Sequence, residues 1–137
     1  MPVVILDSEA LSVLASPKER GASARRAQAV LYAAALKNAP VRTSACVLVE
    51  VYRGKARDAA IDRVLNQGIE VLPVDHGTAR VAARLLADTD LDSRSAIDAI
   101  VVSTAVRLGG ALVLTSDPDD LSKLAANHST VVIQGLP

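Results

Sequence analysis

Aromatic residues are almost missing from this sequence: it contains Tyr32 and Tyr52 but no phenylalanine or tryptophan. Half of its 137 residues are nonetheless apolar, so the core must be built from Ala, Val, Leu and Ile. Proteins that hold single-stranded nucleic acid mainly by base stacking need a series of aromatic side chains. Stacking on aromatic platforms is therefore excluded as a main mode of binding.

Cysteine is equally scarce. Cys46 is alone, which excludes an internal disulfide and argues against a cysteine-based zinc site. The N-terminus lacks the basic segment and long apolar run of a secretory signal, and no uncharged stretch is long enough to span a membrane. We expect one domain over residues 1–137, in a soluble cytoplasmic protein.

Neither charge sign is in excess, since 15 basic residues balance 15 acidic ones. Their distribution is uneven. Residues 1–68 carry ten Lys and Arg against six Asp and Glu, a net +4, and residues 69–137 carry five against nine, a net −4. Overall neutrality argues against a non-specific DNA coat, but it allows a local basic patch around an acidic site.

Strand-like and helix-like segments alternate along the chain. Strands are expected at 2–6, 41–43, 69–74, 111–115 and 131–133, and helices from near residue 8, over 22–38, 44–52, 59–66, 75–86 and 95–108, and from 118. Because the strands are apolar throughout, the pattern predicts an α/β fold with three layers, α/β/α, and a central parallel sheet. Ligands of such sheets bind beyond the carboxyl ends of the strands, where Asp7 and Asp117 should emerge together.

Four carboxylates lie in or at the ends of these apolar segments: Asp7, Glu50, Asp98 and Asp117. Acids in such surroundings are rare unless something offsets their desolvation. Two of them have a simple structural explanation, because Asp7 and Asp117 each precede a helix that their side chains can cap. Pro118, at the first helical position, strengthens that explanation for Asp117.

The other two carboxylates are harder to explain by structure alone. Asp98 lies in a helix that is apolar in almost every direction, and its structural alternative is an ion pair with Arg94 one turn earlier. Glu50 lies too deep in its helix to stabilise the helix dipole, and its alternative is an exposed face shared with Arg53 and Gly54.

Together, the four carboxylates indicate a bound metal ion. Two carboxylates about 4 Å apart repel by ~4 kcal/mol at an effective dielectric near 20, so four in one pocket require a counter-charge. Oxygen ligands without cysteine or paired histidine favour Mg²⁺ or Mn²⁺. Such ions keep bound waters that can become nucleophiles, and they stabilise the charge that develops on a phosphoryl group.

Other reactive side chains add little to this pattern. The hydroxyls of Ser8, Thr115 and Ser116 can bond a carboxylate or a metal-bound water, or can simply cap helices and turns. His76 and His128 lie apart near loops, and we interpret neither as a ligand or a base. No Ser-His-Asp or Cys-His arrangement and no glycine-rich phosphate loop is recognisable.

Four segments around these acids resemble the motifs of PIN-domain ribonucleases, and specifically the VapC-type toxins of bacterial toxin–antitoxin pairs. The resemblance runs from Val4 to about Leu124. Its motifs are residues 4–11 around Asp7, 44–54 around Glu50, 98–110 after Asp98, and 114–121 around Asp117. Any one motif is weak, but all four in this order and at this spacing form a specific signal.

The resemblance implies a metal-dependent endoribonuclease with a PIN-like domain. Asp7, Asp98 and Asp117 would hold Mg²⁺ or Mn²⁺, Glu50 would complete the catalytic set, and hydrolysis would leave a 5′-phosphate and a 3′-hydroxyl. It also implies a homodimer, and a small antitoxin protein with a segment that fills the site.

The chain departs from the family pattern at two places. Glu9 stands where a small polar residue is more common, and Asp120-Leu121 replaces a common Asp-Phe pair. The second departure leaves open whether Asp119 or Asp120 reaches the metal. Basic residues of the first half can guide RNA phosphates or form a solvated surface: Arg25, Arg26, Arg42, Arg53, Lys55 and Arg57.

Three other classes of protein compete with the ribonuclease. A receiver domain needs a lysine after a late strand, where this chain has Asp117. An Asp-x-Asp phosphatase needs a second aspartate where Glu9 stands. The third is a PIN-like binding module without catalysis, whose acids would hold an arginine of a partner.

Overall fold

The computed structural model describes residues 3–137. Its strands form an all-parallel five-stranded sheet in the order β3-β2-β1-β4-β5. The strands are β1 (Val3–Leu6), β2 (Val41–Ser44), β3 (Glu70–Leu72), β4 (Ala111–Thr115) and β5 (Val131–Gly135). The predicted parallel sheet is therefore confirmed, although Pro2 of the first predicted strand lies outside the described residues.

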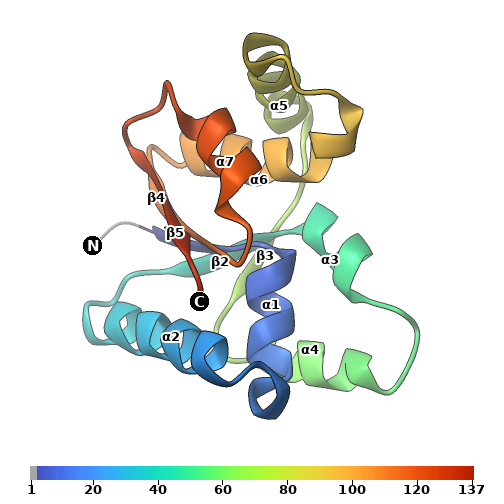
Figure 1. Cartoon of the computed structure of the whole chain (residues 1–137), viewed down its shortest axis with the longest axis vertical. Helices are drawn as coiled ribbons and strands as arrows, with labels where there is room; N and C mark the ends of the chain where they lie inside the picture. Colours follow the sequence, from blue (N-terminus) through green and yellow to red (C-terminus); the bar gives the residue numbers. More distant parts are fainter. Residues whose placement is uncertain (1–2) are drawn as a thin grey trace.

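Helices cover both faces of this sheet (Figure 1). The lower layer in Figure 1 contains α1 (Ser8–Ala15), α2 (Pro17–Leu36) and α4 (Arg57–Leu65), and the upper layer contains α5 (His76–Thr89), α6 (Ala96–Arg107) and α7 (Pro118–Ala125). Helix α3 (Ala45–Val51) follows β2 and contacts both α1 and α6. This arrangement confirms the three-layer α/β/α fold.

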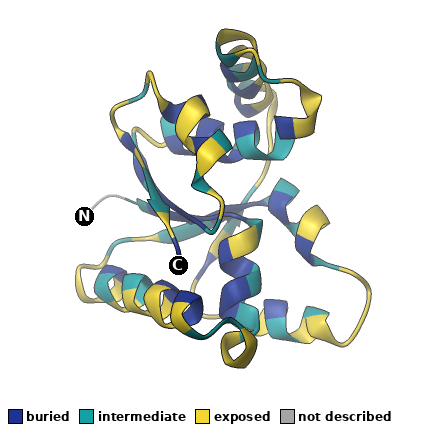
Figure 2. Cartoon of the chain, viewed as in Figure 1, coloured by how far each residue is buried: buried dark blue, intermediate teal, exposed yellow. Residues whose placement is uncertain are grey.

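The core lies on both sides of the central strand β1. Val4, Ile5 and Leu6 are fully buried, and Figure 2 shows buried positions along the sheet and on the helix surfaces that face it. Each buried aliphatic side chain of this size contributes about 1.5–3 kcal/mol relative to an exposed one. An interior of Ala, Val, Leu and Ile thus supports the fold without Phe or Trp. No helix within residues 3–137 is long and apolar enough to cross a membrane.

Several element boundaries differ from those predicted. Helix α2 begins at Pro17 rather than at residue 22, with a kink at Gly21, where φ is +42°. A backbone with positive φ favours glycine, which lets two helical segments meet there. Strand β3 is shorter than the predicted 69–74 because Pro73 has no N–H to donate to a ladder. A 3₁₀ turn, η1 (Ser93–Ser95), precedes α6.

The order of the strands determines where a site can form. From β1 the chain continues to β2 on one side, whereas β4 lies on the other side of β1 and continues to β5. The sheet therefore has a switch point between β1 and β4, and ligands of open α/β sheets bind beyond the carboxyl ends of the strands at such a point. Leu6 pairs with Leu114 in register, so Asp7 and Asp117 follow neighbouring strand ends as predicted.

Candidate metal centre

Asp7 follows β1 and is only 5% exposed. Its Oδ1 accepts a hydrogen bond from the backbone N–H of Ala10 at 2.9 Å, so it caps α1 as the structural alternative predicted. Burial raises the pKa of Asp7 to about 6, and the charges of Asp98 and Glu9 act in the same direction. The Thr115 side chain and the Ala10 N–H oppose that shift. Asp7 is thus both a helix cap and a desolvated acid in a negative environment.

Asp98 lies in the first turn of α6 and is half-buried. Its pKa is raised to about 6. Burial is the largest cause, and the charges of Glu50, Asp120 and Asp117 act in the same direction. Its predicted alternative partner is engaged elsewhere, because Arg94 pairs with Asp92 through Nη2 at 2.9 Å. Among residues 3–137, no Lys or Arg pairs with Asp98. The ion-pair explanation of Asp98 is therefore wrong.

Glu50 is exposed on α3, and the neighbouring Arg53 does not neutralise it. The Arg53 guanidinium instead donates to the backbone carbonyls of Val49 at 3.3 Å and Tyr52 at 3.0 Å. The exposed face predicted for Glu50 is therefore present, but its charge also raises the pKa of Asp98.

Asp117 stands at the N-cap position of α7, yet its side chain makes no capping hydrogen bond. Its backbone N–H donates to Thr115 Oγ1 at 3.0 Å. The capping role predicted as its alternative is not realised, and its exposed carboxylate contributes to the raised pKa of Asp98.

The structure adds one acid to the predicted set. Asp120, in the first turn of α7, is half-buried, and its charge raises the pKa of Asp98. It also lines a surface hollow of about 330 Å³ together with Asp92 and Ser95. Asp119 is exposed and is not among the charges that raise the pKa of Asp98. In the sequence, a role for Asp120 is indicated only by its position one turn after Asp117. This position does not distinguish Asp120 from the adjacent Asp119.

These carboxylates share one negative region without forming a closed cluster. Within residues 3–137, no three Asp, Glu, His or Cys side chains are close enough together to hold a metal ion as they stand. The donor set of carboxylates and hydroxyls suits a hard divalent cation. Beside Asp117, the buried Ser116 Oγ has no hydrogen-bond partner in the described part of the chain.

Neither the thiol nor the imidazoles of the chain are suited to bind a metal ion in this region. Burial raises the pKa of the Cys46 thiol, as do the charges of Glu50 and Asp98, so the thiol stays protonated near neutral pH. Its Sγ lies 3.2 Å from Ser44 Oγ. His76 begins α5, and His128 lies in the turn before β5, which places neither at the carboxyl ends of β1 and β4.

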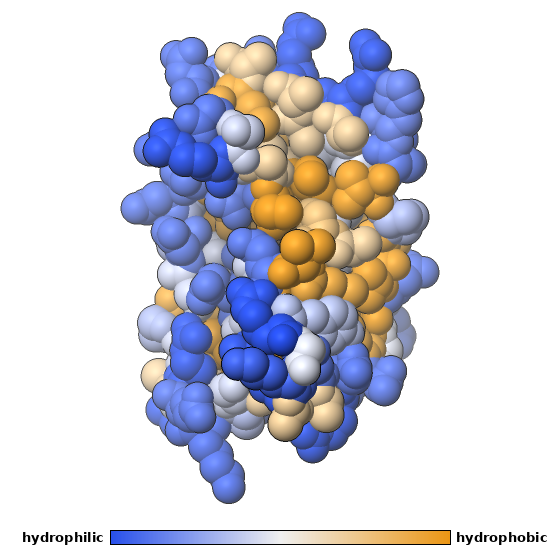
Figure 3. Space-filling model, turned by 90° about the vertical axis from the view of Figure 1, so that its right-hand side faces the viewer, coloured by the Kyte–Doolittle hydropathy of each residue, from blue (hydrophilic) through white to orange (hydrophobic). Residues whose placement is uncertain are grey.

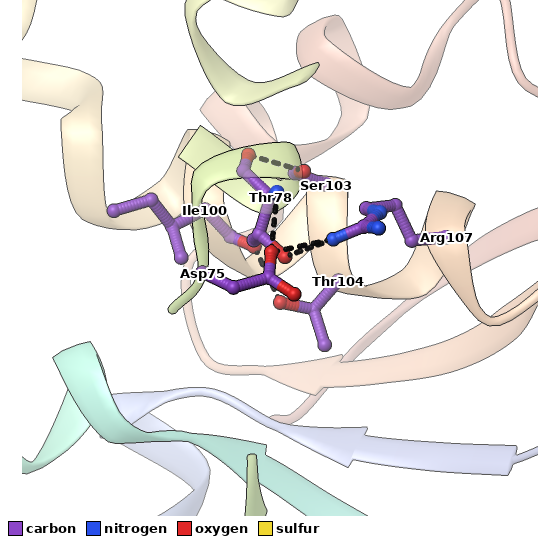
Figure 4. Close-up of polar contacts among 6 residues, drawn as sticks. All are labelled: Asp75, Thr78, Ile100, Ser103, Thr104 and Arg107. Carbon is purple, nitrogen blue, oxygen red and sulfur yellow. Dashed lines mark hydrogen bonds and ion pairs between the residues drawn. The ribbon is translucent and has the colours of Figure 1, made fainter. Parts of the chain in front are cut away.

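A second polar cluster fixes the opposite end of α6 (Figure 4). Asp75 Oδ1 accepts from the Thr78 N–H at 2.8 Å and from Arg107 Nη1 at 2.6 Å. Ser103 Oγ donates to the Thr78 carbonyl at 2.8 Å. The Thr78 N–H, with the neighbouring Arg107, lowers the pKa of Asp75. The cluster ties the start of α5 to the last turns of α6 and so positions the helix whose first turn carries Asp98.

Solved structures of toxin–antitoxin complexes share this fold. The chain superposes on a chain of the crystal structure of VapBC2 from Rickettsia felis bound to a DNA fragment from their promoter, with TM-score 0.71, 16% identity and 100% of each chain covered. A toxin–antitoxin complex from Klebsiella pneumoniae gives TM-score 0.59 and 19% identity, over 94% of this chain and 95% of that one.

Curated protein sequences contain no significant match to this chain. A family model does match: residues 4–127 fit the PIN domain, a stretch that contains all four predicted acids. It covers most of the chain, from the second residue of β1 to the end of α7. The resemblance predicted from the four motifs is confirmed, and the chain belongs to the PIN-domain family.

Proposed function

We propose that this PIN-domain chain is a metal-dependent endoribonuclease toxin of the VapC type, neutralised by a cognate antitoxin. The observation that carries the proposal is the environment of Asp98. Its half-buried carboxylate is surrounded by the charges of Glu50, Asp117 and Asp120, and no cationic side chain of residues 3–137 pairs with it. A divalent cation would relieve this excess of negative charge.

Each acid has a distinct role in this proposal. Asp7, Asp98 and Asp117 hold Mg²⁺ or Mn²⁺, which when bound activates water and offsets the charge on the reacting phosphate. Asp7 is fixed by its bond to Ala10, whereas Asp117 has no capping bond and is free to turn toward the ion. Glu50, exposed on α3, orients the attacking water and accepts its proton. The water oxygen bonds to phosphorus, the bond from phosphorus to O3′ breaks, and the departing O3′ takes a proton from solvent water to become a hydroxyl.

The proposed partners follow from the family and from the surface. Structures of toxin–antitoxin complexes share the fold, which supports an antitoxin partner and a cytoplasmic setting. We also propose a homodimer, because the apolar side chain of Val49 on α3 is exposed. Figure 3 shows an apolar area on the face that Figure 1 presents at its right, where α3 lies. Light scattering of the purified chain tests the dimer directly.

A second candidate is a PIN-domain binding module without catalysis. The distance between the acids favours this candidate, because within residues 3–137 no three of them are close enough together to hold a metal ion as they stand. In that case, an arginine of a partner would neutralise Asp98.

Sequencing of RNA ends distinguishes the two candidates. Purified, antitoxin-free protein is incubated with total RNA and Mn²⁺ or Mg²⁺, with EDTA as control. The nuclease produces new 5′-phosphate ends that disappear with EDTA. RNA that stays intact in the presence of metal would favour the binding module.

A further inference from the structure

The turn between α3 and α4 carries a group of cations with no acidic side chain paired to them. Arg53, Lys55 and Arg57 are exposed, and we call residues 53–57 the basic loop. Ion pairs among residues 3–137 involve other cations: Arg20, Arg42, Arg84, Arg94, Arg107 and Lys123. The side chains of Lys55 and Arg57 are thus available to an anionic ligand, whereas the Arg53 guanidinium is bonded to two backbone carbonyls.

Asp58 holds the backbone of this loop in one conformation. Its Oδ1 accepts a hydrogen bond from the Arg53 N–H at 2.9 Å, and its Oδ2 accepts one from the Gly54 N–H at 2.8 Å. Gly54 has φ of +71°, which disfavours residues with a side chain. Bonds to an ionised carboxylate are stronger than neutral ones, so this pair of bonds keeps the turn closed.

Two further contacts hold the loop between α3 and α4. The Arg53 guanidinium bonds the Val49 carbonyl at 3.3 Å, at the C-terminal end of α3, where the helix dipole favours a cation. Val49 immediately precedes Glu50. Tyr52, the C-cap of α3, donates its hydroxyl to Asp62 of α4. The basic loop is therefore held against the C-terminal end of α3, the helix that carries Glu50.

The other basic residues of the first half are less suitable. Arg42 Nε pairs with Glu70 across β2 and β3 at 2.8 Å. Arg25 and Arg26 lie on α2, which Figure 1 shows on the far side of the lower layer from α3. Among these basic residues, only those of the basic loop combine exposure, the absence of an ion pair within residues 3–137, and direct connection to the helix that carries Glu50.

We infer that the basic loop binds the phosphate backbone of a single RNA strand as it enters the acidic centre. In this arrangement Asp58 and Asp62 are positioning residues that hold the loop without touching RNA. The inference rests on the proposed function. Contacts to phosphate orient a strand without reading its bases, so the loop contributes affinity and register rather than sequence preference.

The first test compares two double variants of equal charge change. Affinity for a labelled, unstructured oligoribonucleotide is measured in EDTA over a range of salt concentrations. Lys55→Ala with Arg57→Ala should lower the slope of log affinity against log salt by about 1.4, since each phosphate contact to a single strand contributes about 0.7. Arg25→Ala with Arg26→Ala should leave the slope unchanged.

In the second test, a positioning role of Asp58 and a purely electrostatic role predict opposite changes in the affinity for RNA. Asp58→Ala removes a negative charge, so electrostatics alone predicts tighter binding of RNA. Positioning predicts binding weaker by roughly threefold or more, because two hydrogen bonds to the loop are lost. Asp58→Asn removes the same charge but keeps one acceptor oxygen, so its affinity should lie between those of Asp58→Ala and the parent. Asp88→Ala, on α5, is the matched control, and circular dichroism verifies that α4 is intact.

Failure of this inference can be told apart from failure of the proposed function. If the parent cleaves RNA but both double variants have the same slope, the loop is not the phosphate site and the nuclease stands. Tighter binding by Asp58→Ala would also overturn the inference. Loss of affinity for a poly-glutamate peptide with unchanged RNA affinity would assign the loop to a protein partner. A parent chain that neither binds nor cleaves RNA overturns both proposals.

Discussion

The backbone N–H of Asp7 donates a hydrogen bond to the carbonyl oxygen of Leu114, 3.3 Å away, at the carboxyl end of the sheet. This bond continues the pairing of β1 with β4 by one residue beyond Leu6. It places Asp7 beside the segment that leads through Thr115 to Asp117. Residues more than a hundred positions apart thus share one edge because the parallel register brings their strand ends together.

Asp98→Asn should abolish RNA cleavage while the fold remains stable. The substitution removes a charge whose desolvation and repulsion already raise its pKa, and it breaks no ion pair found within residues 3–137. We expect activity to fall by about a hundredfold or more, the loss typical of removing a main electrostatic contributor. Cleavage rate and melting temperature are measured together. Full activity, or unfolding of the variant, would contradict this role.

The metal-free protein should become more stable as the pH is lowered from about 7.5 to about 5. The pKa of Asp7 rises from 3.8 to about 6 on folding, so in this window the folded state binds more protons than the unfolded chain. The free energy of unfolding therefore falls as pH rises, and over this window Asp7 contributes about 1.4 kcal/mol of the change. Urea unfolding in EDTA at both pH values measures this difference.

Asp7→Asn provides the control for that pH dependence. An asparagine keeps an acceptor for the Ala10 N–H but carries no charge, so the variant should be more stable than the parent at about pH 7.5. It should also lose part of the pH dependence. A parent and a variant with the same slope against pH would show that Asp7 is not a desolvated acid.

Asp120 and Asp119 should differ in their effect on metal affinity. The Asp120 charge acts on Asp98, whereas Asp119 is exposed and is not among the charges that act on it. Asp120→Asn is expected to weaken Mn²⁺ binding about tenfold, within the range seen when groups that support a metal site are removed. Asp119→Asn should have little effect. Calorimetric titration with Mn²⁺ measures the affinity of both variants. Equal losses of affinity would show that the net charge, and not the position of Asp120, determines metal binding.

The effect of Gly77→Ala on the stability of the fold should depend on Arg107. The substitution should destabilise the parent and stabilise a variant that lacks the Arg107 side chain. A Cβ at Gly77 would lie 2.7 Å from the Arg107 guanidinium carbon, so the side chain must leave Asp75 and Thr78. Alone, the substitution should destabilise the fold. In an Arg107→Ala background it should stabilise the fold by up to about 1 kcal/mol, because alanine loses less entropy than glycine in a helix. Thermal unfolding of the double-mutant cycle measures this coupling, and additive effects would contradict the contact.

The alternation of apolar strands with helices was enough to predict the parallel sheet and the edge of the sheet at which the site lies. The strands that Asp7 and Asp117 follow are apolar, and a parallel sheet directs both ends to one side. Arg94 shows where spacing fails. Four residues separate it from Asp98, but η1 places it outside α6, so the side-by-side geometry of a continuous helix does not exist there.

Features that depend on turn geometry could not be predicted. The bonds from Arg53 and Gly54 to Asp58 require the particular fold of the basic loop, and no pattern in the sequence specifies it. Asp120 was similarly hidden, because Asp119 and Asp120 are chemically identical and only the orientation of α7 places one of them near Asp98.

The central claim is that the acids between β1 and β4 hold the metal that drives RNA cleavage. Its most direct test is to measure the cleavage rate and Mn²⁺ binding by calorimetry on the same preparation over one range of Mn²⁺ concentrations. The account predicts that the rate saturates at the concentration that fills the site, and that Asp98→Asn loses both signals. Cleavage that persists in EDTA, or RNA that stays intact with the Mn²⁺ site filled, would contradict it.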